Sequence, residues 1–481
     1  MNLRKETFPH DATHHPDKRR RIRLRGIGAF LLALGCARSW LTLLFASPSL
    51  PLDTPIDPHH AFDILFCITS VVLALNASRI VPILEARWAK PAALATMTGG
   101  SCAAIAAFLL PRSAEVLAVA SGMLGGAGFA MFLLIWAETL RMLSIARIVL
   151  YSALSQLFAV VLVYFCEGFD TTRLLIAVAI LPLISVTALE NARQNIEDEG
   201  GSLESKNGRA SRTMPWKLIV LFAVFSFAYG LREQQLATGT GVHSSISTGI
   251  AMAALAATVY FFSDRISLNA VSKSTLPLML CGFLLVPFEG FLGSVVSSYM
   301  ISIGYSLMSL LVSLMLYDIS KRFGLFAICL LGLKNAMQIF VVIGSDIAVA
   351  LDSSTLSESA ADSLLTALVV ALLFFAAFIL FSEKELTSTW GVRFMESEAL
   401  TEEGLRNKEI EKRCDHLSRT HKLSPREDEV LRLYAKGFNG PQIEKELFIA
   451  EGTLKTHTRH IYEKLGVPNR KGLYEILGIS K

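Results

Sequence analysis

Two long cations and a threonine fall on one side of a helix predicted near the carboxyl end, over residues 451–465. On a helix that turns about 100° per residue, Lys455, Thr456, Arg459 and His460 share this side, opposite the apolar residues. Lysine and arginine can donate to guanine O6 and N7, and a threonine methyl group can contact thymine. We therefore predict that Lys455, Thr456 and Arg459 contact base edges in the major groove of double-stranded DNA.

Further polar side chains around this helix suit the phosphate backbone. Between residues 453 and 471, Glu463 is the single acid, so the positive charge is local, as a nucleic-acid surface requires. Helix amino ends and cations both bind phosphate oxygens. We expect these other contacts from Thr453, His460, Lys464, Arg470 and Lys471.

Two shorter helices are predicted before the base-contacting helix. Residues 424–427, Ser-Pro-Arg-Glu, form a capping box with proline at the first helical position. Gly437 is expected to end that helix in the left-handed conformation. The second helix should start near Pro441 and bury Ile443 and Leu447. This part of the chain is therefore expected to be a small all-α domain.

Residues 421–481 resemble the carboxyl-terminal domain of LuxR/NarL-type regulators over about 60 residues. The matching motifs are Leu423–Glu427, Glu429–Leu433, Glu451–Thr453, Lys455–His457 and Ile461–Val467. The resemblance implies a four-helix helix-turn-helix head whose third helix contacts bases through Lys455, Thr456 and Arg459. It also implies a homodimer on DNA, formed through the last helix with Leu473, Ile476 and Leu477 as its apolar stripe.

The sequence departs from that family at two positions. Ala450 stands where a serine usually caps the third helix, and a missing cap costs about 1 kcal/mol. Glu444 stands where a small residue is expected. No phosphorylatable receiver domain precedes the head, which argues against two-component input. Residues 383–420 are dense in charge, and form either a solvated linker or a signalling helix.

The rest of the chain has the composition of a membrane protein. The 481 residues are 52% hydrophobic and 18% charged, and the charge is unevenly placed. Apolar windows near the ~20 residues that cross a bilayer predict about twelve helical spans. They fall at 26–46, 60–80, 91–110, 114–137, 145–166, 173–189, 215–235, 245–262, 275–293, 295–317, 323–345 and 362–382. The expected class is an all-α, polytopic helical membrane bundle followed by the DNA-binding head.

Lysine and arginine predict the orientation of this bundle. They collect in the basic tail 1–25 and in the loops after even-numbered spans, whereas 346–362 holds four acids and neither cation. By the positive-inside rule, both termini are cytoplasmic, and we expect the inner (cytoplasmic) membrane. Residues 190–214 form a polar cytoplasmic linker that divides the bundle into 26–189 and 215–382, six spans each.

This six-plus-six layout resembles the major facilitator superfamily of transporters. The resemblance rests on layout alone. The family's signature after the second span is absent, because residues 78–87 read SRIVPILEAR. The resemblance implies the fold of that family, and it implies transport less strongly than fold.

Four polar residues are expected inside the spans: Arg38, Lys334, Asn335 and Gln338. Intramembrane charge is costly and usually faces an interior cavity. These residues could contact a small-molecule effector or ion, or form structural hydrogen bonds between helices, or mark a misplaced span. Gly122 and Gly126 have the spacing that permits close packing of helices.

The pattern excludes several other classes of site. The seven cysteines are scattered without a C-x-x-C pair, so we expect no disulfide framework and no metal site. No Walker loop, nucleophile elbow or dinucleotide fingerprint occurs, so we expect no enzyme and no cofactor. The favoured interpretation is a one-component regulator that senses a small molecule or membrane state. The alternatives are a major-facilitator-like transporter with a regulatory DNA-binding tail, and a scaffold that anchors DNA.

Overall fold

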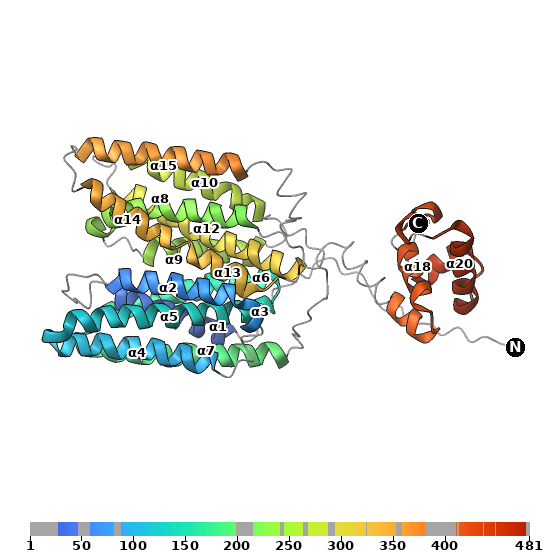
Figure 1. The fold of residues 1–481 in the computed structure, drawn as a ribbon, viewed down its shortest axis with the longest axis horizontal. Coiled ribbons are helices and arrows are strands. Elements are labelled where there is room, and N and C mark those ends of the chain that lie inside the picture. The colour runs from blue at the N-terminus through green and yellow to red at the C-terminus, as the bar shows by residue number, and fades with distance from the viewer. Residues whose placement is uncertain are drawn as a thin grey trace. The chain divides into compact units, whose positions relative to one another are not determined.

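The protein divides into two compact units, and the boundary between them in the sequence lies between Val392 and Arg393. The computed structural model describes residues 27–46, 58–80, 88–198, 215–240, 245–262, 268–286, 294–323, 325–352, 358–380, 410, 413–435, 437–447 and 449–477. We call the helices of residues 27–380 the bundle and residues 413–477 the head. Both are all-helical over these described residues (Figure 1). The expected tail 1–25 lies outside them.

The first half of the bundle contains the six helices expected from the apolar windows. Its elements are α1 (Ile27–Leu41), the π-helical η1 (Thr42–Ala46), α2 (Pro58–Leu75), the short α3 (Ala77–Ile80), α4 (Ala89–Leu109), the 3₁₀ turn η2 (Pro111–Ser113), α5 (Ala114–Arg141), α6 (Ile145–Glu167) and α7 (Thr171–Asp198). The separation of the windows 91–110 and 114–137 is confirmed, because η2 divides α4 from α5.

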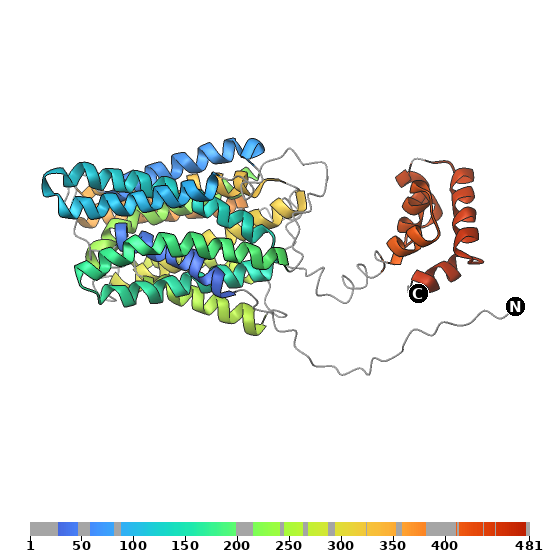
Figure 2. The same cartoon turned by 90° about the horizontal axis from the view of Figure 1, so that it is seen from below.

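The second half follows the same plan. Its helices are α8 (Trp216–Thr240), α9 (Ser245–Phe262), α10 (Leu268–Leu285), α12 (Ser294–Phe323), α13 (Ala327–Ala336), α14 (Ile339–Asp352) and α15 (Glu358–Leu380). Figures 1 and 2 show these helices running alongside one another with those of the first half. Helices from the two halves are in contact, since α13 packs against α2 and α6 packs against α9.

Two predicted boundaries differ from the structure. The window 323–345 is two helices, because α13 ends at Ala336 and α14 begins at Ile339. The amides of Met337 and Gln338 donate to carbonyls three residues back, which tightens the chain at this point. The expected linker 190–214 begins too early, because α7 continues to Asp198; residues 199–214 lie outside the described part.

Small residues let the bundle helices approach closely, as the spacing of Gly122 and Gly126 predicts. A side chain at Gly122 would meet the carbonyl oxygen of Pro58, and one at Gly126 that of Phe62. Both contacts are with α2, so the two glycines form the face of α5 on which α2 packs. This close packing can replace the hydrophobic driving force that helices lack in lipid.

The outer surface of the bundle is apolar enough for a bilayer. Eight helices in the described part of the chain have the length and composition of a membrane span, and three more apolar helices are shorter. Large apolar side chains remain exposed along them, including Leu75, Val116 and Phe165. On a water-soluble protein such a surface would drive aggregation, whereas hydrocarbon solvates it.

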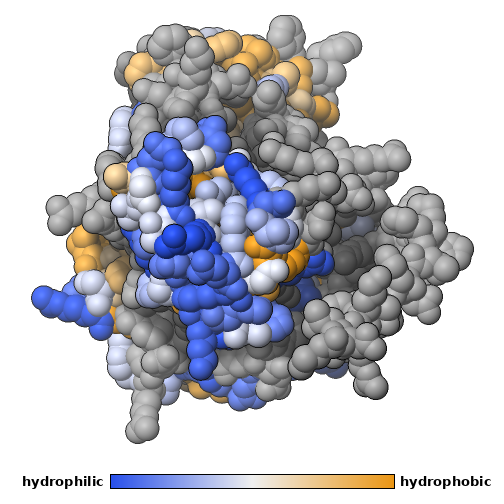
Figure 3. All heavy atoms as spheres, turned by 90° about the vertical axis from the view of Figure 1, so that its right-hand side faces the viewer, coloured by the Kyte–Doolittle hydropathy of each residue, from blue (hydrophilic) through white to orange (hydrophobic). Residues whose placement is uncertain are grey.

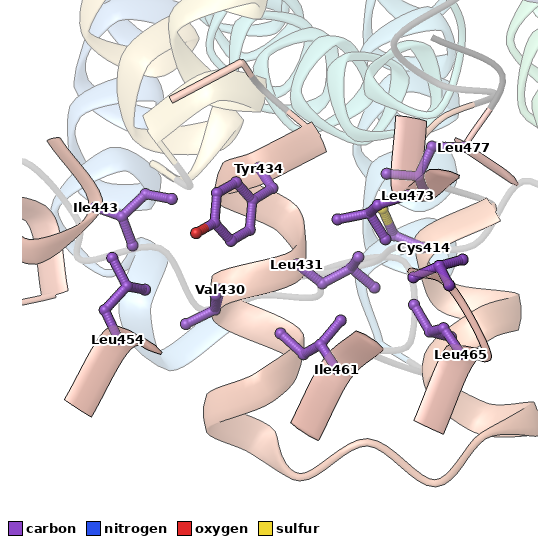
Figure 4. Close-up of a cluster of buried hydrophobic side chains, with 11 residues drawn as sticks. Cys414, Val430, Leu431, Tyr434, Ile443, Leu454, Ile461, Leu465, Leu473 and Leu477 are labelled. Carbon is purple, nitrogen blue, oxygen red and sulfur yellow. The ribbon is translucent and has the colours of Figure 1, made fainter. Parts of the chain in front are cut away.

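The head contains the four predicted helices, α18 (Pro425–Ala435), α19 (Gly440–Leu447), α20 (Glu451–Leu465) and α21 (Arg470–Leu477). Their apolar faces meet in one core (Figure 4). Val430, Leu431, Ile443, Ile461 and Leu473 are fully buried there. The capping box is confirmed, since the Ser424 amide donates to Glu427 at 2.7 Å. Gly437 has the expected left-handed conformation, with φ of 85°.

The head extends further toward the amino end than predicted. Residues 413–420 are helical, and Cys414 is only 1% exposed in the core of the head, with Leu417 packed against it. This segment therefore belongs to the head and not to the linker assigned to 383–420. Residues 383–409, where a signalling helix was one alternative, lie outside the described part of the chain.

Candidate nucleic-acid interface and membrane cavity

Helix α20 is held by its apolar face. Leu454, Ile461 and Leu465 are buried against the rest of the head. The helix starts at Ala450 in an extended conformation without a side-chain cap, as the sequence indicates, and ends at Gly466 with φ of 67°. Because one face is fixed in the core, the opposite face has a defined direction.

That opposite face carries the three residues predicted to contact bases. Lys455 and Arg459 have side chains 76% and 68% exposed, and Thr456 is also exposed. Each cation has an acid one turn away on the same helix. The Lys455 Nζ lies 2.7 Å from Glu451, and the Arg459 Nε lies 3.9 Å from Glu463. The hydrogen bond that Lys455 donates to Glu451 raises the pKa of the lysine, so it stays charged.

A groove of about 1020 Å³ borders this face of α20. Lys455 and Arg459 line it together with Glu444 from α19. From the sequence, Glu444 was noted only as a departure from the family pattern. The structure places its charge beside the exposed cations, where it also raises the pKa of Lys455. Figure 3 shows that the surface on one face of the head is largely hydrophilic.

Two residues predicted to contact phosphate have partners inside the head. The Lys464 Nζ donates to the buried carboxylate of Glu427 at 2.6 Å, and the His460 Nδ1 lies 3.7 Å from that carboxylate. Burial by itself would raise the pKa of Glu427, but the hydrogen bonds from Lys464 and from Ser424 outweigh it, and the pKa is lowered. Lys464 thus compensates a charge that the capping box brings into the core.

Arg470 has a packing role that the sequence did not reveal. Its guanidinium lies 5.0 Å and 5.2 Å from the ring centroids of Tyr434 and Tyr474. It donates to the Tyr474 hydroxyl and to the Phe438 carbonyl, both at 2.6 Å. These contacts connect α18 to α21, and they use two of the five N–H donors of the guanidinium.

The three residues of the apolar stripe predicted for dimerisation differ in burial. Leu473 and Leu477 are 0% exposed and belong to the core of a single head, whereas Ile476 is 39% exposed. The reason is that α21 has one face for its own core, and residues four apart share that face. Of the three predicted residues, Ile476 alone is available at the surface of one head.

The remaining two predicted contacts have less defined surroundings. Thr453 is exposed in the first turn of α20, and its amide donates to the Ala450 carbonyl at 3.0 Å. Lys471 is in the first turn of α21, where the Asn469 side chain accepts from the Gly472 amide. The side chain of Lys471 lies outside the described residues.

In the bundle, all four polar residues predicted in the spans line one cavity of about 330 Å³. Arg38 comes from α1, whereas Lys334 and Asn335 come from the end of α13, and Gln338 from the turn that follows. Their convergence follows from the packing of α13 against the first half of the bundle. The interruption between α13 and α14 therefore lies at the cavity.

Several residues of this cavity were not predicted. Tyr229 and Tyr305 are stacked with ring centroids 4.3 Å apart, and both line the cavity. Ser309 also lines it and accepts a hydrogen bond from the Lys334 Nζ at 2.9 Å. Aromatic residues and serines are common in any span, so nothing in a single sequence distinguishes these from structural ones.

Known proteins resemble the two parts of the chain separately. Residues 421–477 match the family described as bacterial regulatory proteins, luxR family. The HTH-type transcriptional regulator MalT of Vibrio campbellii is 46% identical over 67 residues, which are 13% of this chain and 7% of that protein. MalT of Yersinia pestis is 47% identical over 55 residues, which are 11% and 6%. The chain thus spans only a small part of these relatives.

Solved structures resemble the bundle. A bacterial homologue of the iron transporter ferroportin, in the outward-facing state, covers 74% of this chain and 98% of its own, with 13% identity and a TM-score of 0.52. The Major Facilitator Superfamily transporter FucP, in the outward conformation, covers 74% and 99% with 13% identity and a TM-score of 0.48. At such identity, the first likeness indicates a shared fold and nothing about the cargo.

The family match and the packing differ slightly at the start of the head. The match begins at residue 421, as the sequence predicts, whereas the core already includes Cys414. The segment 413–420 thus packs with the matched domain although it precedes the match. Residues 421–477 are a luxR-family helix-turn-helix domain, in the same chain as an apolar helical bundle whose fold is similar to that of the solved bacterial ferroportin homologue.

Proposed function

We propose that this protein is a membrane-embedded, one-component transcriptional regulator. In this proposal the head binds duplex DNA sequence-specifically, and the bundle senses a small molecule or the state of the membrane. The observation that carries it is the exposed, cationic face of α20, which is fixed by a buried opposite face in the same chain as an apolar bundle.

The base contacts are assigned to Lys455, Thr456 and Arg459. The two cations donate to guanine in the major groove, and the Thr456 methyl group contacts thymine. Their pairs with Glu451 and Glu463 are solvent-exposed, and such pairs contribute little to stability. Exchange of these partners for acceptors on DNA therefore costs little free energy.

Phosphate contacts are assigned first to Thr453 and Lys471, at the amino ends of α20 and α21. His460 and Lys464 are weaker candidates because they lie beside Glu427. Arg470 is the weakest, because two of its donors and its stacking between Tyr434 and Tyr474 hold it within the head. This order differs from the sequence-based expectation, in which all five were equivalent.

Two heads would bind a palindromic site as a homodimer, with Ile476 as the apolar contact at the surface of each α21. The distribution of lysine and arginine supports an inner-membrane location with both termini cytoplasmic. A reporter fused after Lys481 tests this orientation. A periplasmic carboxyl end would separate the head from the chromosome and contradict the regulator.

The DNA-binding test is footprinting of the full chain on the DNA upstream of its own gene, followed by titration of the protected site. Lys455→Ala with Arg459→Ala should weaken binding roughly a hundredfold or more, because each base contact is worth about 1–3 kcal/mol. The slope of log affinity against log salt should flatten by about two. Arg413→Ala with Arg419→Ala removes the same charge from exposed positions outside α20 and is the control. Equal losses in both variants would contradict the assigned face.

A transporter with a regulatory DNA-binding tail is the second candidate. The observation that favours it is the cavity, which is lined by helices of both halves of the bundle. Uptake into proteoliposomes by the full chain and by a chain lacking 383–481 separates the two. Accumulation of a substrate that survives the deletion would favour the transporter.

A further inference from the structure

The cavity of the bundle has walls from both halves and a positive lining. Helices α1, α2, α5 and α6 line it from the first half, and α8, α9, α12, α13 and α14 from the second. Its volume of about 330 Å³ lies at the small end of the ~300–1,000 Å³ range of ligand sites. Such a space suits a small metabolite and not a peptide or a lipid tail.

Two cations face this space without an acid to compensate them. Lys334 is 7% exposed, and its Nζ has a serine hydroxyl at 2.9 Å and the Phe222 ring centroid at 4.3 Å. The Nε of Arg38 is buried and has no hydrogen-bond partner. Among the described residues, neither side chain forms an ion pair. A buried charge in this condition is costly unless a partner arrives.

Two acids in the first half of the bundle each have a basic side chain one turn away on the same helix. Glu138 is 1% exposed and has Arg141 at 3.7 Å. Asp63 is the acid that lines the cavity, and it lies 3.8 Å from His59 on the next turn of α2. The one acid among the described residues that line the cavity thus has a histidine side chain beside it.

The remaining walls are largely aromatic. Phe62, Phe66, Phe129 and Trp136 line the cavity on the first half, and the stacked pair Tyr229 and Tyr305 on the second. Such walls favour flat or apolar groups, with a few polar groups that fix orientation. Asn335 and Gln338 supply amides at the end of α13.

We propose that the cavity binds a small organic anion, with one carboxylate held between Arg38 and Lys334 and an apolar or aromatic body against the aromatic walls. This inference rests on the proposed sensor function and names the chemical class of its effector. A guanidinium can bind a carboxylate with two parallel hydrogen bonds, and the lysine adds a third.

The position of the two cations indicates how binding would change the bundle. Arg38 belongs to the first half and Lys334 to the second, on a helix that ends at the cavity. In the absence of an anion the two positive charges repel one another. A carboxylate between them replaces repulsion by attraction, so it binds better to the arrangement in which the halves are closer. Differential affinity of this kind is what a sensor requires.

The test is thermal unfolding of the purified full chain in detergent micelles, without DNA, over a panel of aromatic and aliphatic monocarboxylates. Each acid, such as benzoate, is paired with its neutral carboxamide, such as benzamide. At least one carboxylate should raise the unfolding temperature in a concentration-dependent way, and its carboxamide should not. No shift with any carboxylate, or equal shifts with the carboxamides, would overturn the proposal.

Variants of the two cations localise the site. Arg38→Gln and Lys334→Met should each weaken the binding of the active carboxylate roughly tenfold to a hundredfold, as loss of one charge-assisted hydrogen bond predicts. Lys334→Arg, which keeps the charge, guards against loss of folding. Arg173→Gln is the matched control, because Arg173 is 74% exposed beside Asp170 at the start of α7. An unchanged affinity in Lys334→Met and Arg38→Gln would overturn the assignment.

Failure of the anion-binding proposal can be distinguished from failure of the DNA-binding proposal. If no anion binds while the Lys455 and Arg459 substitutions abolish footprinting, the effector class is wrong and the regulator stands. If the anion binds but the full chain protects no DNA, the regulator is wrong and the cavity serves another activity.

Discussion

In the head, the buried carboxylate of Glu427 accepts hydrogen bonds from Lys464 and from the Ser424 amide. In the bundle, the cations Arg38 and Lys334 face a cavity and form no ion pair among the described residues. Both regions therefore hold buried charge, but one is compensated within the fold and the other is not. We infer that a compensated buried charge stabilises the fold, whereas an uncompensated buried charge indicates a ligand site.

The comparison assumes that the head is an independent unit with its own core. Leu473→Ala should lower the free energy of unfolding of the fragment 393–481 by about 2–5 kcal/mol, because Leu473 is fully buried. Ile476→Ala should change it by less than about 0.5 kcal/mol and weaken self-association. Urea denaturation and sedimentation measure the two. A large loss of stability in Ile476→Ala would mean that Ile476 also belongs to the core of the head.

Removal of the uncompensated charge of Lys334 should raise the stability of the bundle. We expect Lys334→Met to stabilise the ligand-free bundle by up to about 2.5–3.5 kcal/mol, which is the cost of a lysine at the centre of a membrane-spanning helix. Tryptophan fluorescence of the full chain during heating reports it, with Lys334→Arg as the control that keeps the charge. A clear destabilisation would mean that the Ser309 and Phe222 contacts suffice, and the contrast between the two regions would fail.

The compensated charge of the head predicts a pH dependence. The pKa of Glu427 is below its ordinary value of 4.5, so its ionised form adds stability above that pH. The stability should fall as the pH drops from about 4.5 through the lowered pKa. Glu427→Gln should cost about 1–2 kcal/mol at pH 7 and lose less between pH 5 and pH 3. Parallel pH profiles for both proteins, from urea denaturation of fragment 393–481, would contradict this role.

The exposed pairs of α20 should give the smallest effect. Glu451→Gln removes the partner of Lys455 at the surface, so no measurable change in stability is expected. DNA affinity should rise severalfold, because an acid next to the phosphates is removed and Lys455 is released. Titration of the footprinted site measures this, with Glu446→Gln on α19 as the control. A fall in affinity would show that Glu451 orients Lys455.

Local physics explains what could be predicted. The apolar windows identified the bundle helices because hydrocarbon demands a run of apolar, helical residues wherever the chain crosses. In the head, the Ser424 capping box, the left-handed Gly437 and the apolar period of α20 depend on neighbours a few residues away. The exposure of Lys455 and Arg459 followed from that same period.

The surroundings that could not be predicted are those in which distant residues meet. Residues one turn apart on α21 look equivalent in the sequence, yet Leu473 lies in the core and Ile476 at the surface. Arg470 is a cation beside a recognition helix, and its contact with Tyr434 on α18 depends on how the helices pack. The missing side-chain cap at Ala450 was foreseen because capping depends on neighbouring residues.

The sequence by itself determined that this protein has an apolar, helical body and a helix-turn-helix head with a cationic face, since hydropathy, period and capping act over a few turns. That Arg38 and Lys334 share a cavity, and that Lys464 pairs with the buried carboxylate of Glu427, depends on the tertiary structure. Helices far apart in the chain must pack before their side chains can meet, and no local pattern encodes that meeting.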